Sequence, residues 1–294
     1  MTLTPKAILV PTDFSPASDS ALDLARDLAG PFNAEIHLLH VRTVFDGPIV
    51  SPEDLNEVER VLAMSDARTL QTLEASAKGI EAPTHCHIRR GTAPADAIID
   101  AIGEHDCDLV IMGTHGRRGL KRLLTGSVAQ EVVHHSPVPV LTIRADADDP
   151  RLPQKILVAI DFSERSLSAV GWAAAVAPAL DAEITLLHVV EPPIYPGFYS
   201  LNLLPEKDRE QIVNDCHNAL VNIASEDLGD VPFATAVIYD HVAQGICSFA
   251  EKKNHDLVVL TTKGLSGLAH IALGSVAERV VRLASTPVLT ARGS

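Results

Sequence analysis

The sequence repeats itself at a constant offset of 148 residues, and this repeat limits the possible folds more than any other feature. "ILVPTDFS", beginning at residue 8, aligns with "ILVAIDFS", beginning at residue 156. "AEIHLLHV", beginning at residue 34, aligns with "AEITLLHV", beginning at residue 182. Because one offset serves from the first apolar run to the last, we expect two whole domains in tandem rather than a duplicated motif.

The length of 294 residues agrees with two domains, since single hydrophobic cores rarely grow that large. We place the domains at residues 1–146 and 147–294. The polar, proline-containing stretch "ADADDPRLPQ" at 145–154 is the predicted linker between them.

Each half alternates continuous Val/Ile/Leu runs with helical patterns, which predicts the α/β class. Such runs are typical of parallel strands covered on both faces. We therefore expect two tandem doubly wound domains, each a five-stranded parallel sheet (order 3-2-1-4-5) between helix layers. In the first half the predicted strands are 6–11, 34–41, 84–90, 108–112 and 138–143, and the predicted helices are 15–30, 52–77, 93–105 and 126–135. For the first helix we expect Ser15 as N-cap, Pro16 at the first position and Gly30 as the stop.

Charge and cysteine usage narrow the functional classes. A net charge of −14 argues against a nucleic-acid partner and against docking on an anionic membrane. The amino-terminal residues lead directly into a strand pattern without a signal-peptide layout, and no apolar stretch is long enough to span a bilayer. Four dispersed cysteines form no C-x-x-C pair. We therefore expect a cytoplasmic protein with reduced thiols.

One basic, glycine-rich segment stands out in this acidic chain, "MGTHGRRGLKRLLTGSV" at 112–128. Its glycines are spaced Gly113-x2-Gly116-x9-Gly126, followed by Ser127. We expect Gly113 and Gly116 to adopt positive φ and to let a ligand approach the backbone. The helix that follows offers unpaired amides to an anion. Nearby positive charge comes from Arg117, Arg118, Lys121 and Arg122. No Gly-Lys-Ser/Thr closes the loop, so it is not a Walker A motif.

Asp13 follows the first predicted strand, at the same sheet edge as this loop if the first and fourth strands are neighbours. In doubly wound sheets ligands bind beyond the carboxyl ends of the strands where the winding reverses. The Asp13 carboxylate there suits ribose hydroxyls or a Mg²⁺ ion. The segment pattern therefore predicts a polyphosphate site in the first domain.

These residues, together with "VPTDFS", "HLLHV" and "SPVPVLTIR", resemble a tandem universal stress protein, and the glycine spacing resembles the family's ATP-binding branch. The resemblance covers both halves nearly end to end. It implies contacts to adenosine from Pro11, Thr12 and Asp13, to adenine from the backbone of Val41, to ribose and phosphates from Met112, Gly113, His115 and Gly116, and to the phosphates from Gly126, Ser127 and Val128. We expect Arg117 to join the phosphate contacts.

The second half departs from this pattern. Thr261 replaces the first glycine, and at a position of positive φ a β-branched residue would cost on the order of 1 kcal/mol or more. The basic residues of the loop are also replaced, with only Lys263 as a cation. We expect either a weakened nucleotide site or a scaffold. The candidate positions there are Ala159, Asp161, Val189, Gly264, Gly274, Ser275 and Val276.

The favoured function is a sensor or regulator of the stress response that binds ATP, with ADP or AMP left open. One alternative is a slow ATPase in which His115 acts as base, although no hydrolytic centre is evident. Another is an interaction scaffold without nucleotide, in which the aromatic-rich residues 194–205 cover an apolar ligand or meet a partner. We expect the two fifth strands to pair as an intrachain pseudo-dimer, leave a homodimer open, and expect an unknown regulatory protein partner.

Thirteen histidines raise the question of a metal site. In "HCH", alternation puts His85 and His87 on one strand face and Cys86 on the other. Two ligands are fewer than the four of a structural zinc site, so we favour an ordinary strand and expect no metal from the protein alone apart from Mg²⁺ at Asp13. His40 and His188 recur at the same strand position, where packing and lining of the site both remain open.

Overall fold

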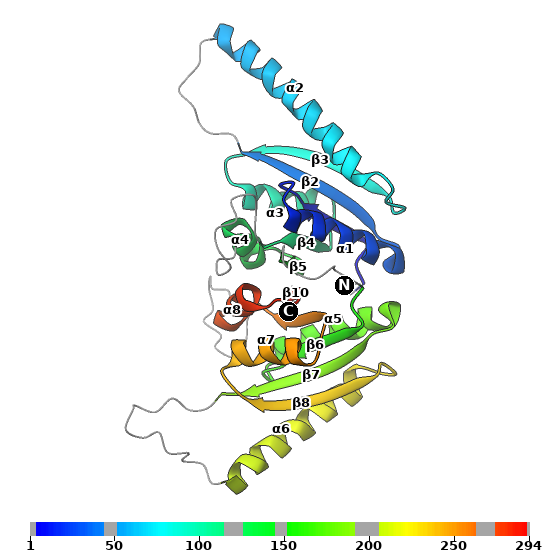
Figure 1. The fold of residues 1–294 in the computed structure, drawn as a ribbon, viewed down its shortest axis with the longest axis vertical. Helices are drawn as coiled ribbons and strands as arrows, with labels where there is room; N and C mark the ends of the chain where they lie inside the picture. Colours follow the sequence, from blue (N-terminus) through cyan, green and yellow to red (C-terminus); the bar gives the residue numbers. More distant parts are fainter. Residues whose placement is uncertain are drawn as a thin grey trace, which may run out of the picture. The chain divides into compact units, whose positions relative to one another are not determined.

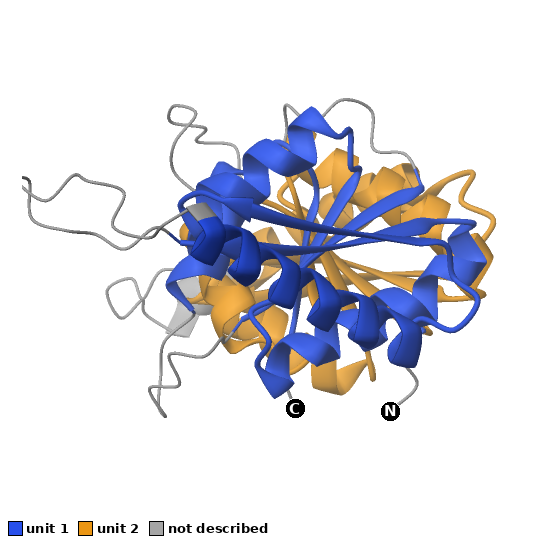
Figure 2. Cartoon of the chain, turned by 90° about the horizontal axis from the view of Figure 1, so that it is seen from below, with its two compact units in different colours: residues 1–4, 151–294 blue, residues 5–150 orange. Residues whose placement is uncertain are grey.

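The computed structural model describes residues 4–43, 52–114, 126–144, 152–191, 206–262 and 274–292, and Figure 1 shows their elements. The chain divides into two compact units, which Figure 2 colours separately. One unit spans Pro5–Pro150 and the other contains Arg151–Ser294.

The first unit is a five-stranded parallel sheet in the order β3-β2-β1-β4-β5. Its strands are β1 (Ala7–Pro11), β2 (Glu35–Thr43), β3 (Thr84–Gly91), β4 (Leu109–Gly113) and β5 (Val140–Ile143). Its helices are α1 (Pro16–Phe32), α2 (Pro52–Ala77), α3 (Pro94–Glu104) and α4 (Ser127–His135). Helices α2 and α3 lie on opposite sides of β3, so helices cover both faces of the sheet.

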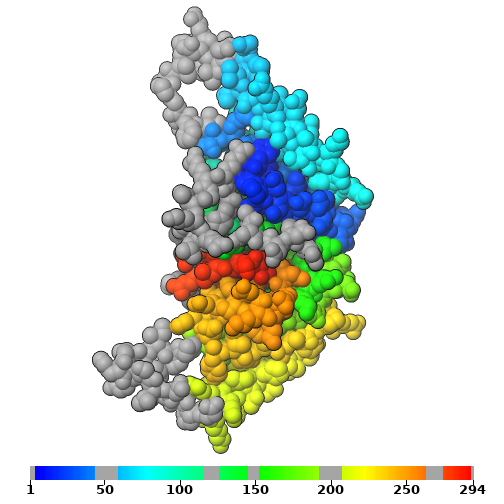
Figure 3. All heavy atoms as spheres, in the orientation of Figure 1, coloured from blue at the N-terminus to red at the C-terminus, as the bar shows by residue number. Residues whose placement is uncertain are grey.

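The second unit repeats this plan with the order β8-β7-β6-β9-β10. Its strands are β6 (Lys155–Ala159), β7 (Glu183–Val190), β8 (Phe233–Tyr239), β9 (Leu257–Thr261) and β10 (Val288–Ala291). Its helices are α5 (Glu164–Leu180), α6 (Glu206–Asp227), α7 (Val242–Lys252) and α8 (Ser275–Leu283). Helices α7 and α8, orange and red in Figure 3, pack side by side. Two doubly wound α/β domains with the predicted strand order are therefore confirmed.

The sheet centre is buried because helices cover both faces of the central strands. Ile8, Leu9 and Val10 of β1 are each fully inaccessible to solvent, as are Ile156 and Leu157 of β6. A strand buried on both faces cannot alternate apolar and polar residues, which explains the continuous runs in the sequence. Among the described residues, no helix has the length and apolar character needed to cross a membrane.

Helix α1 begins where the sequence predicts and ends later. Ser15 caps it, accepting a hydrogen bond from the Ser18 amide, and Pro16 is its first residue. The prediction that Gly30 stops it is wrong, since the helix continues to Phe32. Asn33 ends it with a left-handed φ of 50°. Asparagine tolerates that conformation, and the Asn33 amide still reaches the carbonyls of the last turn.

All four cysteines are free thiols. Burial raises the pKa of Cys107 to about 12 and that of Cys247 to about 11. Both thiols are therefore protonated and poorly nucleophilic at neutral pH.

His255 occupies, in the second copy, the position of Cys107 in the first. It is buried, and its Nδ1 has no hydrogen-bond partner among the described residues. Burial lowers the pKa of His255; the Asp256 charge opposes this shift, and the Lys155 charge adds to it. The folded domain therefore favours the neutral imidazole.

We expect this histidine to make the second domain acid-sensitive. Because the pKa of His255 is lower in the folded state, its contribution to stability is complete above the unfolded value of 6.5 and declines as the pH falls below it. His255→Cys, which installs the residue of the first copy, should reduce this loss. Urea unfolding at about pH 7.5 and about pH 5.5, followed by the fluorescence of Trp172, the chain's single tryptophan, measures it. Equal pH dependence in both proteins would contradict the assignment.

Candidate functional site

The candidate site lies at the carboxyl ends of β1 and β4, the neighbouring strands at which the winding direction reverses. Leu9 pairs with Val110, and both strands continue beyond that pair, to Pro11 and Gly113. Chain segments leaving the two strands can therefore face each other across this edge, which is where doubly wound sheets bind ligands.

After β1 the chain makes a tight turn that orients Asp13. The Thr12 amide donates to the Leu39 carbonyl at 2.8 Å. Phe14 adopts a left-handed φ of 59°, and its amide donates to the Thr12 hydroxyl at 3.0 Å. Asp13 Oδ1 then accepts the Ser15 amide at 3.1 Å. The turn thus holds the Asp13 carboxylate at the amino end of α1, where the helix dipole favours negative charge.

A histidine braces this turn from the neighbouring strand. His40 Nδ1 lies 2.8 Å from the Thr12 carbonyl, so it must carry the proton and donate. The His40 ring also lies 4.9 Å from the Phe14 ring. In the second unit His188 repeats both contacts, with the Ile160 carbonyl at 2.8 Å and the Phe162 ring at 4.5 Å. The packing role that the sequence allowed for these two histidines is therefore observed in both units. The recurring pair of Phe and His was the available signal.

Gly113 is required for packing rather than for its backbone angle. The expectation of positive φ at Gly113 is wrong, because the described glycines with positive φ are Gly79 and Gly229. A Cβ on Gly113 would instead lie 2.7 Å from the Ala17 Cβ and 2.8 Å from its backbone carbon. Helix α1 therefore packs directly on the end of β4, and only glycine permits this approach.

Gly126 positions the amino end of α4. It is the N-cap and, being glycine, supplies no capping side chain of its own. The Gly126 amide donates to the Thr114 carbonyl at 2.6 Å, while the buried Thr114 donates its own amide to Ile143 at 2.8 Å. A Cβ on Gly126 would lie 2.9 Å from the Thr114 oxygen, so a side chain is excluded here as well. Ser127 begins the helix and is exposed.

The remaining predicted contacts divide by burial. The side chains of Pro11 and Met112 belong to the core, so only their backbones face the edge. Val41 and Val128 are half-buried. His115, Gly116 and Arg117 lie outside the described residues, as does Gly264 of the second copy.

The second unit builds the same edge with different side chains. Asp161 Oδ1 accepts both the amide and the hydroxyl of Ser163, at 3.0 and 2.5 Å. Gly274 caps α8, and its amide donates to the Thr262 carbonyl at 2.6 Å. The predicted strain at Thr261 is wrong, because this residue ends β9 without positive φ. Of the other predicted positions, Val189 is buried, Ala159 and Val276 are half-buried and Ser275 is exposed.

A separate histidine cluster lies beside the edge strand β3. His85 and His87 face the same side, as predicted, and the structure adds His37 from β2 and His105 from the end of α3. Burial, followed by the charges of His105, His37 and His85, lowers the pKa of His87 to about 4. Burial also lowers the pKa of His105. The sequence analysis missed His37 and His105, which lie far apart in the chain.

Comparisons with known proteins find the same family in both halves of the chain. The model of the universal stress protein family matches residues 5–144 and again 153–292. A universal stress protein of Mycolicibacterium smegmatis is 28% identical over 305 aligned positions, covering 98% of each chain. One of Methanocaldococcus jannaschii is 35% identical over 140 residues, covering 47% of this chain and 82% of that protein. The crystal structure of a universal stress protein from Archaeoglobus fulgidus has the same fold, with a TM-score of 0.68, 22% identity and 98% of each chain covered.

The contact between Gly113 and Ala17 predicts a selective loss of stability. Gly113→Ala should destabilise the first domain by about 1–3 kcal/mol, because the backbone of α1 must move away. Gly103→Ala is the control, since a Cβ at that position in α3 meets nothing within 4 Å. It should be neutral or stabilise by up to about 1 kcal/mol. Urea unfolding followed by far-ultraviolet circular dichroism compares them, and equal midpoints would disprove the contact.

Proposed function

This chain belongs to the universal stress protein family, and we propose that its first domain binds an adenine nucleotide, ATP foremost, as a nucleotide-dependent sensor or regulator. The observation that carries the proposal is the amino end of α4. Gly126 provides no capping side chain for this helix end, which follows the carboxyl end of β4 in the chain. The first amides of an α-helix have no partner within the helix and carry partial positive charge, so they suit a phosphate group.

Asp13 supports the same assignment from the neighbouring strand. Its Oδ1 is oriented by the Ser15 amide, and the whole turn is braced by His40. A carboxylate held in this way fits a ribose hydroxyl or a Mg²⁺ ion, which usually binds one or two carboxylates together with substrate phosphates. We propose that Mg²⁺ neutralises charge between Asp13 and the phosphates.

We propose that the second domain binds nucleotide more weakly. Its edge keeps the glycine cap and the aspartate, as Gly274 and Asp161. The Asp161 oxygen is already shared by two donors from Ser163. The corresponding loop has also lost most of its basic residues. Cationic help for a triphosphate is therefore smaller there.

We also propose that the protein acts through protein–protein contacts. A sensor of this kind would pass its nucleotide state to a regulatory protein partner. Pairing of the two fifth strands within the chain, and a homodimer of two chains, remain predictions from the short, apolar, proline-led sequences of these strands. Size-exclusion chromatography with light scattering, with and without ATP, measures the second of these.

A charge at the first position of α4 tests the site without disturbing the fold. Ser127→Glu should weaken ATP binding at least about tenfold, because the new carboxylate repels the phosphates. It should leave stability unchanged or raise it by about 0.3–1 kcal/mol, because helix amino ends favour negative charge. Isothermal titration of the full chain with ATP, ADP and AMP, each with and without Mg²⁺, measures the affinities.

Ser275→Glu at the same position of α8 is the matched control. It should leave the tighter binding event unchanged. Absence of binding to the unmodified chain at millimolar ATP, or equal affinity in the Ser127→Glu variant, would refute a nucleotide site at α4. If the folded chain binds none of the three nucleotides, the alternative of an interaction scaffold is favoured.

The ATPase alternative has its own readout. Asp13→Asn keeps an oxygen that can accept the Ser15 amide and removes the charge that would hold Mg²⁺. Phosphate release by the unmodified chain that exceeds release by this variant would indicate hydrolysis at the same edge. If the unmodified chain and the variant both release phosphate only at the background rate, the chain binds nucleotide without hydrolysing it.

A further inference from the structure

We propose that His37, His87 and His105 bind a divalent transition-metal ion of the Zn²⁺ class. The proposal is independent of nucleotide binding. One nitrogen from each of the three histidines can be chosen so that all three lie within 4.8 Å of one another. Imidazole is a preferred ligand of zinc, copper and nickel, and three histidines with one open position form a known zinc arrangement.

Two of the three nitrogens are already at coordination spacing. His37 Nδ1 lies 3.1 Å from His87 Nε2. Two nitrogens bound at about 2.0–2.1 Å in tetrahedral geometry would be about 3.3–3.4 Å apart, so little movement is needed. Without metal, one proton must lie between the two rings. When a metal ion binds both nitrogens, it takes the place of that proton. The proton then moves from His87 Nε2 to His87 Nδ1.

A carboxylate sets the tautomer of the most buried ligand. His37 Nε2 lies 3.1 Å from Glu35 Oε1, so it is the nitrogen that carries the proton. This leaves the lone pair on His37 Nδ1, which is the atom that faces His87. His85 lies 3.6 Å from the other oxygen of Glu35. The arrangement of carboxylate, histidine and ligand position is the one that orients histidines at zinc sites.

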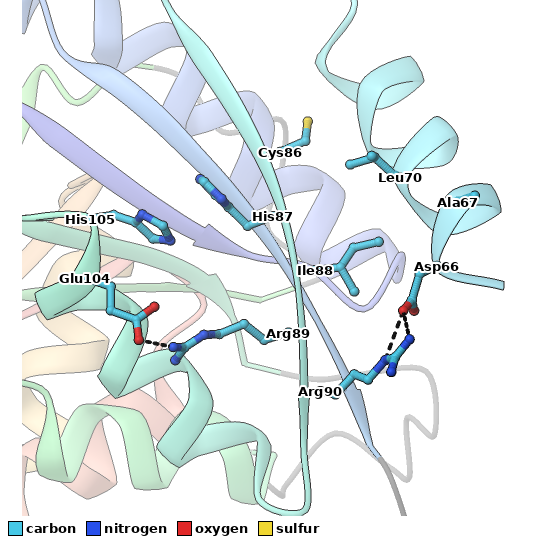
Figure 4. Close-up of a pocket in the computed structure, with 10 residues that line it drawn as sticks. All are labelled: Asp66, Ala67, Leu70, Cys86, His87, Ile88, Arg89, Arg90, Glu104 and His105. Carbon is cyan, nitrogen blue, oxygen red and sulfur yellow. Dashed lines mark hydrogen bonds and ion pairs between the residues drawn. The ribbon is translucent and has the colours of Figure 1, made fainter. Parts of the chain in front are cut away.

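The third ligand comes from the end of helix α3, which packs on β2 and β3, and it completes the cluster. His105 caps the carboxyl end of α3, and its ring lies 4.0 Å from the His87 ring and 5.0 Å from the His37 ring. His87 and His105 both line an open hollow of about 680 Å³ along β3. Figure 4 shows the two rings directed toward each other on the α3 side of the strand, away from Cys86. Water from this hollow can reach the fourth coordination position.

The fold does not require these histidines. The second unit has the same strand pairing, with Thr185 and Ala236 at the positions of His37 and His87. The carboxyl end of α7 holds Lys253 in place of His105. Three imidazoles therefore converge in one copy of a scaffold that the other copy builds without any of them. A function specific to the first domain accounts for this difference.

The test is metal titration of the full chain after treatment with a chelator and without nucleotide. Zn²⁺ should bind with about one equivalent at micromolar affinity or tighter and raise the unfolding temperature, because it binds only the folded arrangement. Co²⁺ should give the intense visible absorption of a tetrahedral, nitrogen-bound ion. Each of His37→Gln, His87→Gln and His105→Gln should lower the affinity at least about tenfold.

Two further variants separate this site from surface binding. Glu35→Gln should weaken Zn²⁺ binding by about tenfold or more, through the orientation of His37. His241→Gln, an exposed histidine of the second unit, should change nothing. His105→Gln alters only a helix end, so it decides the outcome if the more buried variants fail to fold. A hydrated, octahedral Co²⁺ spectrum, or Zn²⁺ stoichiometry and affinity unchanged in His105→Gln, would overturn the proposal.

Discussion

The candidate nucleotide site depends on how closely backbone approaches backbone at the carboxyl ends of β1 and β4. Helix α1 rests on Gly113 at a distance that excludes a Cβ, and Gly126 bonds to the Thr114 carbonyl in a space that excludes one as well. Together these contacts determine where α4 begins and where its first amides point. The two glycines therefore act first as packing residues. Any ligand chemistry at this edge uses a geometry that the packing has already established.

The sequence predicted the architecture because its evidence is local or repeated. Continuous apolar runs identify buried parallel strands, and one constant offset identifies the duplication. One prediction failed because the deciding contact is distant in the chain. Gly113 is needed because Ala17 of α1 leaves no room for a Cβ, and no local sequence pattern distinguishes such a glycine from one with positive φ. The end of α1 was misplaced because Asn33, two residues beyond Pro31, accepts the left-handed conformation that we expected to require glycine.

Duplication separates what the fold needs from what a single domain has acquired. His40 and His188 make the same hydrogen bond to the turn after the first strand of their units, so this contact belongs to the scaffold. The glycine caps of α4 and α8 are shared as well. By contrast, the second copy has other residues at the positions of the histidine cluster and of the basic loop. Features found in one copy on a common backbone are the better candidates for function, since packing alone does not demand them.

The two candidate sites of the first domain lie toward opposite ends of its sheet. Gly113 ends β4, whereas His37 lies near the start of β2, and parallel strands bring their amino ends to one edge. Helix α3 runs antiparallel to the strands, so His105 at its carboxyl end lies at the end of the sheet where β2 begins. A metal ion there would join β2, β3 and α3, whereas a nucleotide would contact β1, β4, α4 and, through the Val41 backbone, the carboxyl end of β2. Energetic coupling between sites requires an element with two arrangements that both ligands bias. Because β2 is the element common to both sets, and His37 and Val41 lie toward opposite ends of that strand, we expect the two ligands to bind independently.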